Sequence, residues 1–120
     1  MKALTLTQPW ATLVAIGAKR IETRSWYTSH RGLLAIHAAK GFPRWCEEMC
    51  LYEPFATTLE GAGVRRPELP LGAIIAVVDL VDCIETGIRG FVPSEPELSF
   101  GDYTPGRFAW VLENVCRLKE

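Results

Sequence analysis

Apolar and polar residues alternate in the first segment of the chain. Leu4 and Leu6 fall on one side of an extended backbone, and Thr5 and Thr7 fall on the other. Because successive side chains of a strand point to opposite faces, residues 2–7 are predicted to form a short strand with one buried face.

A helical pattern follows this strand. Pro9 suits the first turn of a helix, with Thr7 or Gln8 as its cap. The apolar residues that follow at helical spacing are Trp10, Leu13 and Val14. Gly17 is a suitable C-terminal stop, so we expect a short helix with one apolar face.

Two further strands are predicted in the first third of the chain. Over residues 19–26 one face of the strand carries polar and aromatic side chains, namely Arg20, Glu22, Arg24 and Trp26. Arg31 and Gly32 form a turn, and residues 33–38 are apolar on both faces. Such a strand belongs in the centre of a sheet.

The middle of the chain is predicted to be helix and loop. Pro43 opens a second helix, whose buried stripe would consist of Trp45, Cys46, Met49, Cys50 and Tyr52. Residues 55–70 are rich in Gly, Pro and Thr, which indicates a long loop with a helical turn at residues 57–60.

The last part of the chain contains two long predicted strands. Residues 73–84 form the stronger one, and a strand of that length bends or carries a bulge. Residues 93–106 contain three prolines and are predicted as a loop, after which residues 107–118 form the final strand. The pattern predicts an α+β barrel, because it lacks regular βαβ units.

Length and composition limit the class of protein. The chain has 120 residues, 48% of them hydrophobic, which suits one domain over residues 1–120 with one core. No apolar run approaches the roughly 20 residues that span a bilayer. The first ten residues lack the apolar centre of a signal peptide. We therefore expect a cytoplasmic protein.

The charges are distributed unevenly. Residues 1–45 carry seven basic side chains and one acidic one, whereas residues 46–120 carry six basic and thirteen acidic ones, for a net charge of −1. This asymmetry suggests an anionic ligand on one side. In the alternative, the two halves interleave and the charges mix.

The cysteines and histidines suggest neither disulfides nor a metal. None of the four cysteines forms a CxxC pair, and His30 and His37 lack metal-motif spacing relative to them. We expect reduced cysteines that act as small hydrophobic residues, and no metal or other cofactor.

The polar strand face over residues 19–26 is the main candidate for chemistry. Arginines can pair with phosphate oxygens, Glu22 can accept a hydrogen bond from a base, and Trp26 can stack on it. In an equally supported alternative, the charges pair across an exposed strand and Trp26 packs on the barrel rim. Lys19 and Glu22 could also transfer protons, but their opposite parity on a strand separates them unless a turn or bulge brings them together.

Several segments of the chain together resemble the ASCH domain family. They are Leu6–Ala11, Gly17–Trp26, Arg31–Gly32, Ile36–Lys40, Leu69–Ile75, Phe100–Tyr103 and Gly106–Trp110. The resemblance implies a small PUA-like β-barrel with two or three short helices and a polar cleft beside the first helix. It also implies a role in RNA or coactivator-linked biology.

The resemblance also implies a set of ligand-binding residues. Those that would line or shape the cleft are Gln8, Trp10, Lys19, Glu22, Arg24 and Trp26, with His37, Lys40 and Tyr103 at or near it. Some proteins of similar fold are ribonucleases, or amidohydrolases of acylated cytidine that use a Lys, a Thr and a Glu. Lys19 matches the lysine, but Glu22 stands in place of the threonine.

Three hypotheses follow. The first is a module that binds single-stranded RNA, another nucleic acid or a modified nucleotide; the small net charge predicts weak, salt-sensitive binding. The second is a small hydrolase, a nucleoside amidohydrolase or ribonuclease, with Lys19 and Glu22 as catalytic residues. The third is a protein-interaction adaptor that uses the acidic half of the chain.

Overall fold

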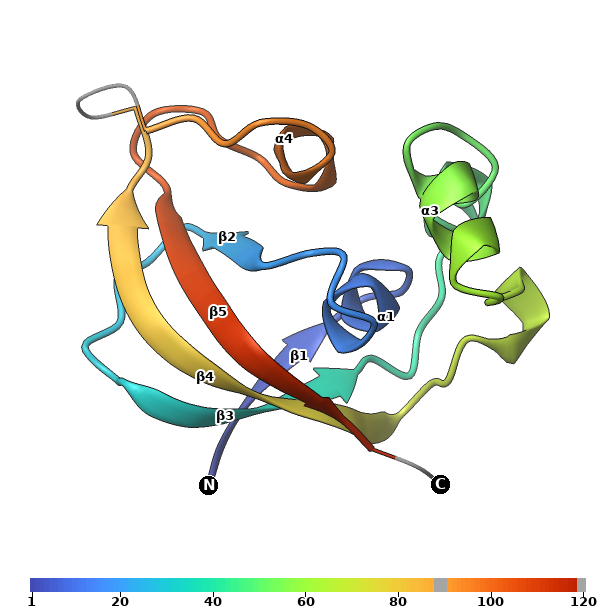
Figure 1. The fold of residues 1–120 in the computed structure, drawn as a ribbon, viewed down its shortest axis with the longest axis horizontal. Coiled ribbons are helices and arrows are strands. Elements are labelled where there is room, and N and C mark those ends of the chain that lie inside the picture. Colours follow the sequence, from blue (N-terminus) through green and yellow to red (C-terminus); the bar gives the residue numbers. More distant parts are fainter. Residues whose placement is uncertain (88–90, 119–120) are drawn as a thin grey trace.

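The strands form one five-stranded sheet in a computed structural model, which describes residues 1–87 and 91–118 (Figure 1). In chain order the strands are β1 (Lys2–Leu6), β2 (Ile21–Arg24), β3 (Gly32–Ala38), β4 (Ala73–Glu85) and β5 (Phe108–Arg117). Their order across the sheet is β1-β3-β4-β5-β2. β1 pairs with β3 in parallel, and the other three pairs are antiparallel.

The sheet curls around the first helix. This helix, α1 (Trp10–Ala15), lies on the concave side of the sheet (Figure 1) and contacts β1, β3, β4 and β5. Its buried residues Ala11 and Val14 join a core made with strand residues such as Leu6, Ile36 and Leu80. The architecture confirms the prediction of a small α+β, PUA-like barrel with short helices.

The curvature of the long strands has a local cause. The pairing of β4 with β5 shifts register between Val77 and Asp79 and again between Leu80 and Asp82. A bulge bends a strand and increases its twist. The bend predicted for the long strand is therefore confirmed, and it carries the sheet around α1.

The predicted buried stripe of the second helix is wrong in part. In α2 (Arg44–Met49) and the turn after it, Cys46 and Cys50 are buried. Trp45 and Tyr52, in contrast, are 60% and 63% exposed. The short helix lies at the edge of the molecule, so the protein covers only one side of it.

Helical turns occur in both segments that were predicted mainly as loops. They are α3 (Phe55–Gly61), the 3₁₀ turn η1 (Arg66–Glu68) and α4 (Glu97–Phe100). Phe55, Leu59 and Phe100 form a second, smaller core with Leu13 of α1. These distant contacts stabilise turns whose local Gly and Pro content favours loops, and they place α4 beside α1 (Figure 1).

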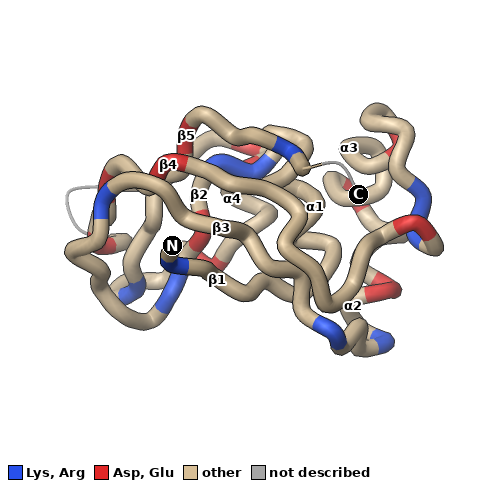
Figure 2. The backbone as a smooth tube through the Cα atoms, turned by 90° about the horizontal axis from the view of Figure 1, so that it is seen from below, with Lys and Arg blue, Asp and Glu red and all other residues tan. Residues whose placement is uncertain are grey.

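The basic and acidic halves of the chain interleave. β2, from the basic half, pairs with β5 from the acidic half, and Figure 2 shows charges of both signs at each end of the molecule. The charge asymmetry of the sequence is therefore not a division of the surface.

Other sequence features can be placed in the described residues. Cys46, Cys50 and Cys83 are free and buried, and Cys116 is free and exposed. Within residues 1–87 and 91–118, no three His, Cys, Asp or Glu side chains gather as metal ligands. The same residues form no helix with the length and hydrophobicity to traverse a bilayer.

Candidate functional site

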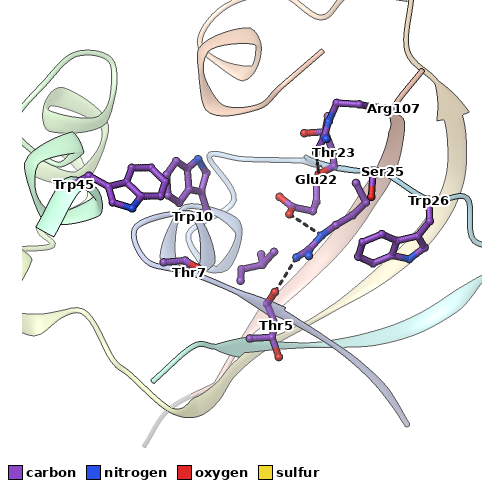
Figure 3. A pocket seen from close by; sticks show the side chains of 11 residues that line it. Thr5, Thr7, Trp10, Glu22, Thr23, Ser25, Trp26, Trp45 and Arg107 are labelled. Atoms are coloured by element: carbon purple, nitrogen blue, oxygen red, sulfur yellow. Dashed lines mark hydrogen bonds and ion pairs between the residues drawn. The ribbon is translucent and has the colours of Figure 1, made fainter. Parts of the chain in front are cut away.

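A cavity of about 320 Å³ lies where α1, β1 and β2 meet (Figure 3). We refer to it as the first cavity. Its lining residues are Thr5, Leu6, Thr7, Trp10, Glu22, Thr23, Arg24, Ser25, Trp26, Trp45 and Arg107. Four of the predicted site residues thus lie around one cavity: Trp10, Glu22, Arg24 and Trp26.

Tryptophans form both ends of the first cavity. Trp10 and Trp45 lie together at one end, with ring centroids 5.7 Å apart, and Trp26 lies at the other end (Figure 3). The Trp10 indole donates a hydrogen bond to the Phe100 carbonyl at 2.9 Å. Trp26 packs edge-on against Trp110 at 6.0 Å between centroids and remains 49% exposed. The cavity therefore has flat apolar walls at both ends, and the hydrogen bond holds the Trp10 ring in place.

The Glu22 carboxylate lies between these walls (Figure 3), and Arg24 lines the same cavity. The Glu22 Oε2 and Arg24 Nε atoms form an ion pair at 3.0 Å. Arg24 Nη2 also donates to the Thr5 carbonyl at 2.7 Å, and its Cζ lies 5.4 Å from the centroid of the Trp26 ring. Since a guanidinium has five N–H donors, Arg24 keeps donors for an anion.

The sheet topology explains why the Thr5 carbonyl is free of strand pairing and can accept the hydrogen bond from Arg24. Among the described residues, β1 is an edge strand whose one partner is β3, and the Leu6 carbonyl accepts a hydrogen bond from the Ala39 backbone on that side. Backbone groups of consecutive strand residues point to opposite edges, so the groups of Thr5 face the first cavity.

Lys19 lies beneath Glu22. Its ammonium is 3.4 Å from Glu22 Oε1 and donates to the Ile21 carbonyl, and the residue is 2% exposed. β2 begins only at Ile21, and the backbone N–H of Lys19 donates to the Leu13 carbonyl in the last turn of α1. On a regular strand, positions 19 and 22 would point to opposite faces. The turn before the strand brings the Lys19 and Glu22 side chains together instead.

A second cavity of about 260 Å³ adjoins the first. The two share Trp10, Glu22 and Thr23, and the remaining lining residues of the second are Ser99, Phe100, Gly101 and Asp102. The backbone N–H of Asp102 donates to Thr23 Oγ1 at 3.1 Å, which ties the loop after α4 to β2.

Tyr103 lies beside the second cavity, with its ring close to Gly101. Its hydroxyl is buried and has no hydrogen-bond partner among the described residues. Burial, with smaller contributions from the charges of Glu97 and Glu22, raises the pKa of Tyr103 well above its usual value. Tyr103 is therefore a neutral phenol at physiological pH.

Three predicted site residues are held in other contacts. Gln8 is fully buried, its amide nitrogen donating to Pro70 at 2.8 Å and its oxygen accepting from the Thr12 backbone at 2.9 Å. His37 Nδ1 lies 3.2 Å from Thr5 Oγ1, and the Lys40 side chain packs along Gly72. None of these three lines either cavity, and their role as ligand contacts stays a prediction.

Sequence reasoning missed several residues of the first cavity. Thr5 and Thr7 carried a signal, since they form the polar face of the first predicted strand. Trp45 was assigned to a buried stripe. Arg107 comes from the far end of the chain and donates to the Thr23 carbonyl at 3.2 Å, a contact that depends on the pairing of β2 with β5.

Comparisons with known proteins agree with this fold. The model of the ASCH domain matches residues 4–119. The chain is 36% identical over 112 residues to human activating signal cointegrator 1 and 39% identical over 112 residues to its mouse counterpart. The match covers 92% of this chain but 18% of each relative, so the chain spans about a fifth of their length.

Proposed function

The chain belongs to the ASCH domain family, and we propose that its first cavity binds a base and an adjacent phosphate of single-stranded nucleic acid, RNA in particular. The observation that carries this proposal is the Glu22–Arg24 ion pair between the tryptophan walls. The family assignment supports nucleic-acid binding in general, and the preference for RNA rests on the PUA-like fold.

The lining residues offer each group that a nucleotide requires. A base can stack on an indole, which stabilises single-strand binding by about 1–3 kcal/mol per base. The Glu22 carboxylate accepts hydrogen bonds, and the guanidiniums of Arg24 and Arg107 suit phosphate oxygens. The exposed half of Trp26 leaves one end of the cavity open to a continuing strand.

Hydrolysis by Lys19 and Glu22 has weaker support from the geometry. The Lys19 ammonium is occupied by the Ile21 carbonyl and by Glu22, and Lys19 lines neither of the two cavities. A catalytic group has to reach the atom on which it acts. In this arrangement Lys19 positions the Glu22 carboxylate.

The direct test compares arginines inside and outside the cavity. Arg24→Ala is expected to weaken binding of a short fluorescent single-stranded RNA by at least tenfold in an anisotropy titration, with a matched DNA run in parallel. Arg44→Ala is the control, because the Arg44 side chain is 92% exposed and lies outside the cavity. It should change the affinity less than twofold.

Two results would count against the proposal. One is unchanged affinity for every oligonucleotide in both Arg24→Ala and Trp26→Ala, with folding verified by circular dichroism. The other is an equal loss in Arg44→Ala and Arg24→Ala, which would indicate general charge attraction in place of a defined cavity.

A further inference from the structure

The two adjoining cavities differ in the charges of their lining residues. The first contains the cations Arg24 and Arg107 together with the Glu22 carboxylate. The charged lining residues of the second are Glu22 and Asp102, both acidic. The shared Glu22 therefore lies between a side lined by two cations and a side whose charged lining residues are both carboxylates.

Asp102 is held in its ionised form. Its Oδ1 accepts hydrogen bonds from the backbone N–H of Thr104 at 3.1 Å and from the Thr104 hydroxyl at 2.8 Å. These bonds lower the pKa of Asp102. Arg107 Nε lies 3.5 Å from the other oxygen, but Arg107 lines the first cavity and not the second.

Glu22 keeps acceptor capacity although both of its oxygens are paired. One oxygen faces Lys19 at 3.4 Å and the other faces Arg24 at 3.0 Å. An ionised carboxylate has about four lone-pair sites, so each oxygen can accept another hydrogen bond. A donor group in the second cavity can therefore reach an acceptor without breaking either ion pair.

The wall of the second cavity depends on a glycine. A Cβ atom on Gly101 would lie 2.9 Å from a ring carbon of Tyr103 and 3.4 Å from Thr23 Oγ1. The absence of a side chain lets the loop after α4 approach β2 this closely. Trp10, whose indole donates to the Phe100 carbonyl at 2.9 Å, also lines this cavity, so the cavity has a flat apolar wall together with its acceptors.

We propose that the second cavity binds the amino-bearing edge of adenine, cytosine or guanine, while the phosphate of the same nucleotide lies in the first cavity. This inference rests on the proposed function. Carboxylates accept hydrogen bonds from exocyclic amino groups, whereas the O4 carbonyl of uracil or thymine would face two anions. The charges thus set the direction in which the ligand lies and select among bases.

The experiment compares four nucleoside monophosphates in NMR titrations of the labelled protein. CMP and UMP form the closest pair, because their bases differ in the amino and carbonyl groups at C4. AMP, CMP and GMP are expected to bind about tenfold more tightly than UMP, the scale of discrimination by one well-placed carboxylate. Asp102→Asn should narrow the ratio of CMP affinity to UMP affinity to threefold or less, because the new amide can donate to O4.

The matched control is Glu113→Gln, because Glu113 is an exposed acid outside the second cavity. It should leave the ratio of affinities unchanged.

Different failures identify different errors. Equal affinity for CMP and UMP in the unaltered protein would overturn the amino-edge subsite and leave the proposed function standing. An equal loss for all four nucleotides in Asp102→Asn would also overturn it, because Asp102 would then support the fold and not the choice of base. Absence of binding by every nucleotide and every oligonucleotide would overturn both proposals.

Discussion

The first cavity and a third, larger one lie on opposite sides of a single ion pair. Glu22 lines the first, whereas its partner Lys19 lines the third, which has a volume of about 660 Å³ against 320 Å³. The third cavity lies along the middle and C-terminal part of β5. Its lining residues are Val14, Gly17, Lys19, Arg20, Ile21, Val78, Glu97, Val111, Leu112, Glu113, Asn114 and Val115.

The difference between these cavities lies in their lining residues, and it is the reason that the smaller cavity and not the larger one is proposed as the base-binding site. Half of the lining residues of the third cavity are aliphatic and none is aromatic, and its two cations are matched by two carboxylates, Glu97 and Glu113. The first is half as large but contains three tryptophans and an excess of one positive charge. A nucleotide needs a flat stacking surface and a cation near its phosphate.

The largest expected effect concerns the ion pair that separates the cavities. Lys19→Ala leaves the Ile21 carbonyl and one Glu22 oxygen without their cation in a buried site. Loss of one partner of a buried pair is strongly destabilising, so we expect the free energy of unfolding to fall by about 3 kcal/mol, measured by urea denaturation. Lys2→Ala, at an exposed lysine, is the control and should change it by less than about 0.5 kcal/mol. Equal stability of the two variants would show that Lys19 does not support the site.

The next effect concerns the aromatic end of the first cavity. Trp45→Ala removes the exposed half of the Trp10–Trp45 pair, and we expect the affinity for a short single-stranded RNA to fall by roughly 5- to 150-fold. Tyr52→Ala is the matched control, because Tyr52 is similarly exposed but lies outside the cavity. If both variants lost affinity equally, the RNA would be contacting exposed aromatic side chains nonspecifically and not the first cavity.

The smallest of the three effects is the dependence of the RNA affinity on salt concentration. Two arginines line the first cavity, and each phosphate neutralised in a single strand contributes about −0.7 to the slope of log affinity against log salt. The proposed site holds one phosphate, so we expect a slope of about −0.7, which is roughly a 2.6-fold loss of affinity between 50 and 200 mM salt. Arg24→Ala should bring the slope closer to zero. A slope near zero would mean that no phosphate contacts the arginines, and a much steeper one would require cations beyond this cavity.

The features that could be predicted from the sequence are those with a local signal. Alternation at period two identifies β1 and the polar face of β2, so Glu22 and Arg24 could be assigned to one face before any tertiary contact was known. The length of β4 predicts its bend because an extended strand of thirteen residues cannot stay straight in a small barrel.

Features that depend on distant contacts could not be predicted in this way. Trp45 fits a helical stripe, and its place at the cavity follows from its contact with Trp10, which is distant in the sequence. Arg107 joins the site because β5 pairs with β2. The second cavity needs α4, a single helical turn in a segment rich in proline whose position is set by the burial of Phe100.

The central claim is that the first cavity, and not the third, binds single-stranded RNA. Its most direct test is an NMR titration of the labelled protein with a short single-stranded RNA, in which signals from the first and the third cavity are followed. We predict that the indole signals of Trp10, Trp26 and Trp45 shift together while the methyl signals of Val111 and Val115 in the third cavity remain in place. Shifts confined to the valine methyls, or no shift in any of the three indoles at saturating RNA, would contradict the assignment of the first cavity as the binding site.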